Sequence, residues 1–196
     1  MSKRIFSILP AIMLAAMLSI NAIPKDKNAD KAVQWIRNPD VVYVGTAYDL
    51  ISKMLQMAKV TKGDMVYDLG CGDGRMVVLA AQKYGCHAVG YDIDPVRVDE
   101  SLKNVARNHV ENLVKIVQAD IFTLDLSQAD VLPMYLLPEM NRKLLPQLEK
   151  LKPGSRIVTH DYGLDGIVAD KTITVISNED NASHTLSLYT TPLKKQ

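Results

Sequence analysis

The sequence has few cysteines and no excess of charge of either sign, and both absences exclude whole classes of protein. Its only cysteines are Cys71 and Cys86, too few for a disulfide framework or a four-ligand zinc site. The 23 lysines and arginines are balanced by 22 aspartates and glutamates, so no basic surplus exists to bind a phosphate backbone. We expect at most one disulfide and no nucleic-acid partner.

Internal repeats and low-complexity segments are also absent from the 196 residues, a length that allows one compact domain. Hydrophobic residues make up 47% of the chain, which is enough to bury a core. The sequence therefore predicts a folded domain rather than a disordered or fibrous chain.

The first residues depart from this pattern. Two basic residues precede an apolar run over residues 5–20. As a helix this run would span about 24 Å, short of the roughly 30 Å hydrocarbon core, although extension to residue 23 nearly closes the gap. Residues 1–22 are predicted to be a cleaved signal peptide or an uncleaved membrane anchor, with a buried helix as a third alternative. The first two imply a domain that is exported to the periplasm or medium, or held at a membrane through residues 5–23.

Residues 23–40 turn polar and are predicted to form a linker and an N-terminal helix, which leaves 41–196 as the main domain. Thr46 and Asp49 resemble a capping box at the start of a first helix that ends near Gly63. Beyond it, short apolar runs alternate with helical periodicity. The predicted strands are 65–69, 88–93, 114–118, 131–137 and 156–159, and the predicted helices are 75–84, 96–108 and one containing Leu144 to Leu151.

The tail is different, because residues 172–177 and 185–190 are rich in β-formers and only the turn-forming stretch 178–181 lies between them. This pattern predicts a C-terminal antiparallel hairpin. Together with the alternating part, it predicts an α/β fold with a mostly parallel sheet, crossover helices on both faces and seven strands in all.

A glycine-rich loop is the most informative motif. A strand ends in Asp68, and three alternating glycines, Gly70, Gly72 and Gly74, precede the next helix. Glycines allow positive φ and let a ligand lie against the backbone, while the helix N-terminus offers unpaired N–H groups. The alternative is an ordinary tight turn between strand and helix.

Two further strands end in acids, which favours the ligand interpretation. Asp92 stands where doubly wound folds place a carboxylate that binds ribose hydroxyls. Asp120 ends the third strand and can accept a hydrogen bond from an adenine amino group. Asp94, before Pro95, is predicted to be a helix N-cap instead.

The motif D-L-G-C-G-D-G resembles that of the class I S-adenosylmethionine-dependent methyltransferases, and the resemblance extends from about Val41 to the C-terminus. It implies S-adenosylmethionine as cofactor and a Rossmann-like sheet of seven strands, the last antiparallel. The residues that it assigns to the cofactor are Asp68, Gly70, Cys71, Gly72, Gly74, Asp92, Ile93, Asp120 and Ile121.

Three segments, Tyr43–Thr46, Tyr135–Glu139 and Thr159–Asp161, also resemble the small bacterial and mitochondrial methyltransferases grouped with the lysine methyltransferase of the ATP synthase c subunit. Gly45 replaces the proline usual in that group. The Asn-Pro-Pro-Tyr motif of methyltransferases that modify amides is missing, which disfavours such acceptors. The resemblance implies a protein lysine amine as acceptor.

That resemblance builds the acceptor pocket around Tyr135, Pro138 and Glu139, with Tyr43–Thr46 as a lid. Tyr135, Glu139 and His160 are candidate catalytic residues, His160 as a base. Each also has a simpler interpretation, as a core aromatic, a first-turn acid and a structural histidine.

The sequence also bears on metal binding, on the state of the cysteines and on alternative functions. His87, His109 and His184 share no spacing typical of a metal site, so none is predicted. The cysteines are expected to be free thiols, unless the chain is exported and the oxidising environment there joins them in a disulfide. A non-catalytic, exported nucleoside-binding module and a small-molecule methyltransferase are the alternative functions. A nicotinamide-dependent dehydrogenase is less favoured, because the loop lacks the G-x-G-x-x-G spacing.

Overall fold

The computed structural model describes residues 36–196. The predicted leader, residues 1–22, lies outside this range, as do residues 23–35 of the predicted linker and helix; residues 36–40 form no helix. No helix in the described range combines the length and the apolar character needed to cross a membrane.

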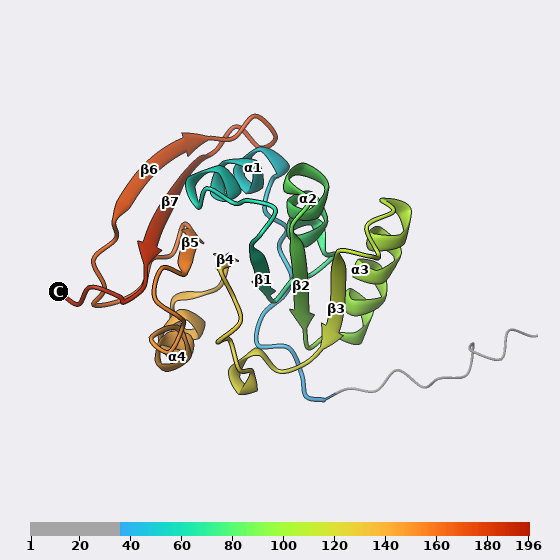
Figure 1. Cartoon of the computed structure of the whole chain (residues 1–196), viewed down its shortest axis with the longest axis horizontal. Coiled ribbons are helices and arrows are strands. Elements are labelled where there is room, and N and C mark those ends of the chain that lie inside the picture. Colours follow the sequence, from blue (N-terminus) through green and yellow to red (C-terminus); the bar gives the residue numbers. More distant parts are fainter. Residues whose placement is uncertain (1–35) are drawn as a thin grey trace, which may run out of the picture. The chain divides into compact units, whose positions relative to one another are not determined.

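The described residues form one seven-stranded sheet in the order β3-β2-β1-β4-β5-β7-β6 (Figure 1). The pairs among β1 to β5 are parallel, whereas β7 runs antiparallel to both β5 and β6. This confirms the predicted mostly parallel sheet and its C-terminal hairpin. The strands are β1 (Met65–Leu69), β2 (His87–Asp92), β3 (Val114–Gln118), β4 (Val131–Met134), β5 (Arg156–His160), β6 (Lys171–Ile176) and β7 (Ser183–Thr190).

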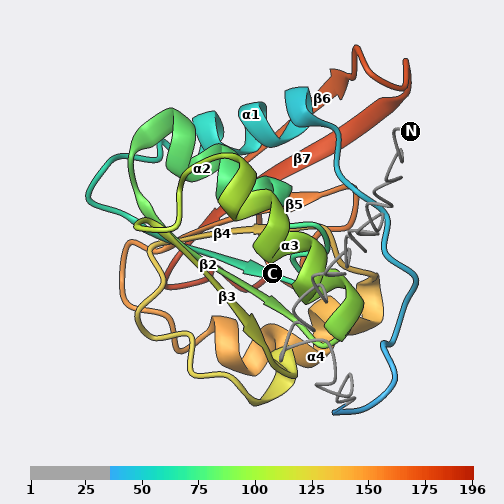
Figure 2. The same ribbon diagram turned by 90° about the vertical axis from the view of Figure 1, so that its right-hand side faces the viewer.

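Helices cover both faces of the sheet, with α4 on the side away from α1 and α2 (Figures 1 and 2). The described helices are α1 (Tyr48–Met57), α2 (Arg75–Tyr84), α3 (Pro95–Arg107), α4 (Pro138–Leu148) and the short 3-10 turn η1 (Ile121–Thr123). Asp94 caps α3 by accepting from the Val96 N–H at 2.8 Å, which confirms the predicted N-cap.

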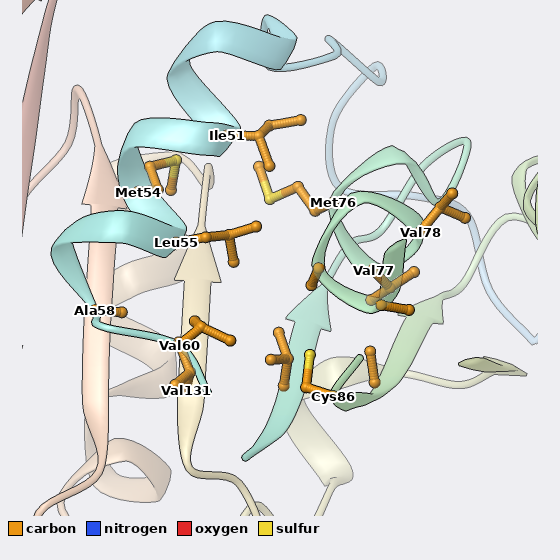
Figure 3. Packing of buried hydrophobic residues seen from close by; sticks show 14 of the residues in the cluster. Ile51, Met54, Leu55, Ala58, Val60, Met76, Val77, Val78, Cys86 and Val131 are labelled. Atoms are coloured by element: carbon orange, nitrogen blue, oxygen red, sulfur yellow. The ribbon is translucent and has the colours of Figure 1, made fainter. Parts of the chain in front are cut away.

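Two hydrophobic clusters explain why the elements adopt this arrangement. Alternate residues of β1 point to opposite faces, so Val66 joins the cluster under α1 and α2, and Leu69 joins the cluster under α4. Figure 3 shows the first cluster, in which Ile51 and Leu55 of α1 lie beside Met76 of α2. Both cysteines are buried free thiols.

Several local predictions are wrong. The first helix ends at Met57, not near Gly63, and α4 ends at Leu148, before Leu151. β4 ends at Met134, not at residue 137, and residues 135–137 form the connection to α4. The capping box is also wrong, because Ala47 precedes α1 and no side chain caps that helix. The Thr46 hydroxyl instead lies 3.2 Å from His160 Nδ1, and Asp49 accepts from the backbone N–H of Asn178 at 2.7 Å. Each side chain has a hydrogen-bond partner that is distant in sequence.

Candidate active site

The glycine-rich loop connects β1 to α2 in a conformation that only glycine adopts readily. Gly70, Gly72 and Gly74 have φ values of 78°, 56° and 76°. Helix α3 holds the loop in place, because the hydroxyl of Ser101 in that helix donates to the Gly72 carbonyl at 2.7 Å. A Cβ on Gly74 would lie 3.0 Å from the Ser101 Oγ, so this helix could not approach if the residue were larger.

Gly72 has a second neighbour, which the sequence did not indicate. A Cβ at this position would lie 1.8 Å from Cε2 of Tyr43, a residue of the segment that precedes α1. The Tyr43 hydroxyl donates to Asp73 Oδ1 at 2.8 Å, and Arg75 donates to the Thr46 carbonyl at 3.1 Å. The segment is therefore fastened across the glycine-rich loop. Residues 37–46, which precede α1, are called the lid below.

The same packing explains why glycine replaces proline at position 45. A Cβ on Gly45 would lie 2.6 Å from the Arg75 guanidinium. Arg75 in turn forms an ion pair with Asp73 at 2.8 Å. A larger residue at position 45 would therefore require the end of the Arg75 side chain to shift.

Asp92, at the end of β2, is buried and rigidly oriented. Its Oδ2 accepts from the Gly72 N–H at 2.8 Å, and its Oδ1 accepts from the Asp94 N–H at 2.9 Å. Burial raises the pKa of Asp92, and the two backbone donors oppose that shift. Each carboxylate oxygen keeps a lone pair that can accept from a ligand hydroxyl.

Asp68, at the end of β1, has no such partners. It is 4% exposed, and no donor in the described range hydrogen-bonds to its carboxylate. Burial, together with the negative charges of Asp92 and Asp73, raises the pKa of Asp68 to about 8. A buried carboxyl that lacks a cation is a favourable place for the ammonium group of a ligand.

Asp120, which is predicted to bind the adenine, already forms an ion pair with Arg37. Arg37 donates to its Oδ2 from Nε at 2.7 Å and to its Oδ1 from Nη2 at 3.1 Å. The hydrogen bonding by Arg37 is the largest cause of the lowered pKa of Asp120. Arg37 belongs to the lid, so the predicted adenine-binding carboxylate also fastens the chain over the site.

A cavity of about 290 Å³ lies between residues 37–44 of the lid and the ends of the central strands. This is close to the lower end of the range for small-molecule sites, about 300 Å³. Of the predicted cofactor residues, Gly70, Asp92, Ile93 and Ile121 line the cavity. Asp68 and Cys71 line a small adjoining pocket, while Gly72, Gly74 and Asp120 line neither of these two.

Aromatic rings form the wall of the cavity near β4. Tyr135 and Tyr162 both line it, with ring centroids 6.4 Å apart and planes 7° from parallel. The sequence reasoning missed Tyr162, although it directly follows the Thr159–Asp161 motif. Its loop is held by Asn141 of α4, whose amide donates to the Tyr162 carbonyl at 3.1 Å.

The other two candidate catalytic residues do not line the cavity. Glu139 is exposed on the first turn of α4. His160 is buried behind Tyr135, with ring centroids 4.0 Å apart. Burial lowers the pKa of His160, and its two ring nitrogens contact Thr46 and His184. These contacts suit a residue that positions Tyr135, and a direct role as base stays a prediction.

Comparisons with known proteins agree with this geometry. Residues 68–171 match the family described as the ANTKMT methyltransferase domain. A protein-lysine N-methyltransferase of Saccharolobus islandicus is 42% identical over 153 residues, which are 77% of this chain and 94% of that protein. The human lysine N-methyltransferase of the ATP synthase c subunit is 30% identical over 124 residues, and the match spans about half of its length.

A solved structure shares the fold over the same region. The RNA methyltransferase from Salinibacter ruber, in complex with S-adenosyl-L-homocysteine, is 39% identical, with a TM-score of 0.70. The match covers 76% of this chain and 94% of that one. The chain thus shares its fold with a protein that binds the product of the predicted cofactor.

Proposed function

The chain belongs to the ANTKMT methyltransferase domain family, and from that premise we propose that it methylates the ε-amine of a lysine in a protein. S-adenosylmethionine supplies the methyl group when it is bound. The observation that carries the proposal is the aromatic wall formed by Tyr135 and Tyr162, in the same cavity as Gly70 and Asp92.

The residues at the strand ends fit this cofactor. The oriented carboxylate of Asp92 suits the two ribose hydroxyls. The unpartnered carboxyl of Asp68 suits the ammonium of the methionine part, because a cation favours the ionised form of that carboxyl. The positive φ of Gly70 lets the backbone approach the ligand without a Cβ in between.

The aromatic wall fits a lysine side chain. Faces of tyrosine rings attract ammonium groups and also pack against the aliphatic stem of lysine. The amine must be neutral to accept a methyl group, and burial against these rings lowers its pKa from the usual value of about 10.4. The wall therefore supports both binding and deprotonation of a lysine.

RNA is the second candidate acceptor, because the Salinibacter ruber protein is described as an RNA methyltransferase. The surface near the cavity favours a protein. Val42, Val44 and Leu137 are 88%, 64% and 38% exposed, and all three line the cavity. An apolar rim suits a protein surface better than a phosphate backbone.

The test is to incubate purified protein with labelled S-adenosylmethionine and fractions of cells that lack the gene. We expect label on lysine of one or a few proteins, identified by mass spectrometry. Tyr135→Ala and Tyr162→Ala should raise the KM for that acceptor about 2- to 30-fold, the range of cation–π energies of 0.5–2 kcal/mol. Tyr135→Phe keeps the ring face and is the matched control.

Affinity for S-adenosylhomocysteine should stay unchanged in all three variants, which separates the acceptor site from the cofactor site. Glu139→Gln is a second comparison, because an exposed carboxylate outside the cavity lining could attract the ammonium only at long range. Label on RNA or on a small metabolite would overturn the lysine proposal and leave only the methyltransferase family.

We also propose that residues 1–22 export the domain or anchor it to a membrane, on the strength of the apolar run over residues 5–20. Cell fractionation with an antibody against the chain tests this, with a variant lacking residues 1–22 as the control. Equal distribution of both forms in the cytoplasm would contradict it.

A further inference from the structure

Two histidines that are distant in sequence meet at the junction of β5 and β7. His160 ends β5 and lies opposite Leu186 of β7, and His184 is two residues from Leu186. Both side chains therefore project from the same face of the sheet. His160 Nε2 lies 2.9 Å from His184 Nδ1.

Asp161 completes a triangle of ligand atoms. Its Oδ1 accepts from the Thr185 N–H at 2.9 Å, which leaves Oδ2 facing the histidines. Oδ2 lies 3.0 Å from His184 Nδ1 and 3.4 Å from His160 Nε2. Two histidines and a carboxylate thus bring three metal-binding atoms together.

Hydrogen bonds alone satisfy this triangle poorly. A histidine ring nitrogen has either one proton or one lone pair, yet His184 Nδ1 has partners at 2.9 Å and at 3.0 Å. A cation between the three atoms would accept a lone pair from each of them.

The dimensions of the triangle fit such an ion. Atoms held about 2.1 Å from one ion are about 3.0 Å apart at a right angle and about 3.4 Å apart at the tetrahedral angle. Two of the observed separations, 3.0 and 3.4 Å, match these values, and the third, 2.9 Å, is about 0.1 Å shorter than the right-angle value.

The outer nitrogen of each histidine has the partner that a metal ligand needs. His184 Nε2 lies 3.0 Å from Asp180 Oδ2, and His160 Nδ1 lies 3.2 Å from the Thr46 hydroxyl. Metal-binding histidines commonly donate their other N–H to such an oxygen, which orients the ring. His184 and Asp161 keep side-chain exposures of 13% and 29%, so an ion can enter from solvent.

We propose that His160 Nε2, His184 Nδ1 and Asp161 Oδ2 form a binding site for one divalent transition-metal ion of the zinc type. The ion would join β5 to β7 directly behind Tyr135, on which the His160 ring is stacked. Three protein ligands leave at least one coordination position for water. The proposal concerns metal binding and does not depend on the methyl acceptor.

The test uses the full chain without an affinity tag, with Zn²⁺ as probe in competition with a chromogenic chelator. We expect one Zn²⁺ per chain with a Kd below about 1 µM. His184→Ala and Asp161→Asn should each weaken binding at least about 100-fold, and Asp180→Asn about 10-fold. His87→Ala removes an exposed histidine outside the site and should change nothing.

Asp161→Asn keeps the oxygen that accepts from Thr185, so this variant should fold even where His184→Ala does not. Co²⁺ is the second probe, because its visible absorption reports nitrogen ligands and coordination number. Binding of S-adenosylhomocysteine shows that each variant is folded. Lack of saturable Zn²⁺ binding, or equal binding by wild type and Asp161→Asn, would overturn the proposal.

Discussion

The acidic residues at two places along the sheet differ in how their charge is compensated. One place is the carboxyl ends of β1 and β2, here called the β1–β2 end, and the other is where the end of β5 meets the start of β7, here called the β5–β7 end. At the β1–β2 end, Asp68 and Asp92 are buried without a cationic side chain, and burial raises the pKa of both. At the β5–β7 end, Asp161 and Asp180 contact His184, and hydrogen bonds to backbone N–H groups and to His184 help to lower their pKa values. The carboxyls at the β1–β2 end could therefore be stabilised by a positively charged ligand, whereas those at the β5–β7 end already have His184 as a partner.

The comparison extends to stability. The β1–β2 end is shaped by steric limits at glycines, and substitution there affects ligand space directly. The β5–β7 end is held by polar contacts between segments that are distant in sequence, so substitution there should loosen the fold locally. Variants at the two ends should therefore separate binding from stability.

The largest effect is expected for Gly72→Val. The new side chain opposes a φ of 56° and collides with Tyr43, so affinity for S-adenosylhomocysteine should fall at least about 100-fold, or about 2.7 kcal/mol. Calorimetry measures the affinity. Gly154→Ala is the matched control, because Gly154 has a φ of 87° and no atom within 4 Å of its would-be Cβ.

The control should lose stability by about 1 kcal/mol from backbone strain and keep its affinity. A double variant of Gly72→Ala with Tyr43→Ala sharpens the result. If affinity returns in the double variant, the collision with Tyr43 caused the loss. If affinity does not return, the cause is backbone strain at position 72 or contact of the new side chain with the ligand. Normal binding by Gly72→Val would mean that the loop is only a turn.

The next effect concerns Asp68 and pH. Because its pKa is raised to about 8, the free protein holds a proton there below pH 8. A cationic ligand requires the ionised carboxyl, so affinity should fall by up to tenfold per unit as pH drops below 8. Asp68→Asn should bind about 10-fold more weakly at pH 9 and show a flat profile at lower pH.

Calorimetry in two buffers of different ionisation enthalpy counts the protons released at pH 7. We expect nearly one for the wild type with S-adenosylhomocysteine and none for Asp68→Asn. Methylthioadenosine lacks the ammonium and should release none from either protein. The ligand-free protein should also lose stability as pH rises from about 4 to 8, since the native state keeps a proton that the unfolded chain gives up.

The same contrast explains which parts of the structure the sequence could predict. The loop from Asp68 to Gly74 is contiguous, and β1 and β2 each place an acid at the strand end, so periodicity and spacing were enough. Tyr43 against Gly72 and His184 against His160 join residues that are distant in the chain. No local pattern encodes such contacts, because tertiary packing decides them.

The error at Asp49 shows the same limit. The residue stood at the capping-box position, but its side chain accepts from the Ser177 hydroxyl and the Asn178 N–H. A turn more than a hundred residues away provides these partners, which no local capping rule can anticipate.

Asp49→Ala should therefore loosen the β6–β7 turn and lower the free energy of unfolding by about 1 kcal/mol. The pKa of Asp49 is lowered mainly by the Asn178 N–H. This stability is therefore present above the unfolded pKa of about 3.9 and is lost as pH falls from there through the lower folded pKa. Hydrogen exchange should accelerate at Asn178 but not in β1. Asp125→Ala is the control, because the Asp125 side chain accepts hydrogen bonds from the nearby Ser127 and links no distant segments.

The smallest effect is expected for Arg37→Ala, which releases the lid from Asp120. Both side chains are partly exposed, at 32% and 19%, so the free energy of unfolding should change by less than about 1 kcal/mol. Dissociation of S-adenosylhomocysteine, followed by stopped flow, should be about 3-fold faster, because the ion pair holds residues 37–44 over the cavity.

Lys194→Ala removes an ion pair, with Asp170, of which neither residue lines the cavity, and should leave the dissociation rate unchanged. If Arg37→Ala instead slows dissociation, Asp120 binds the ligand more strongly once Arg37 is gone, and the ion pair competes with the cofactor. The two outcomes decide whether the ion pair between Arg37 and Asp120 retains the ligand or opposes its binding.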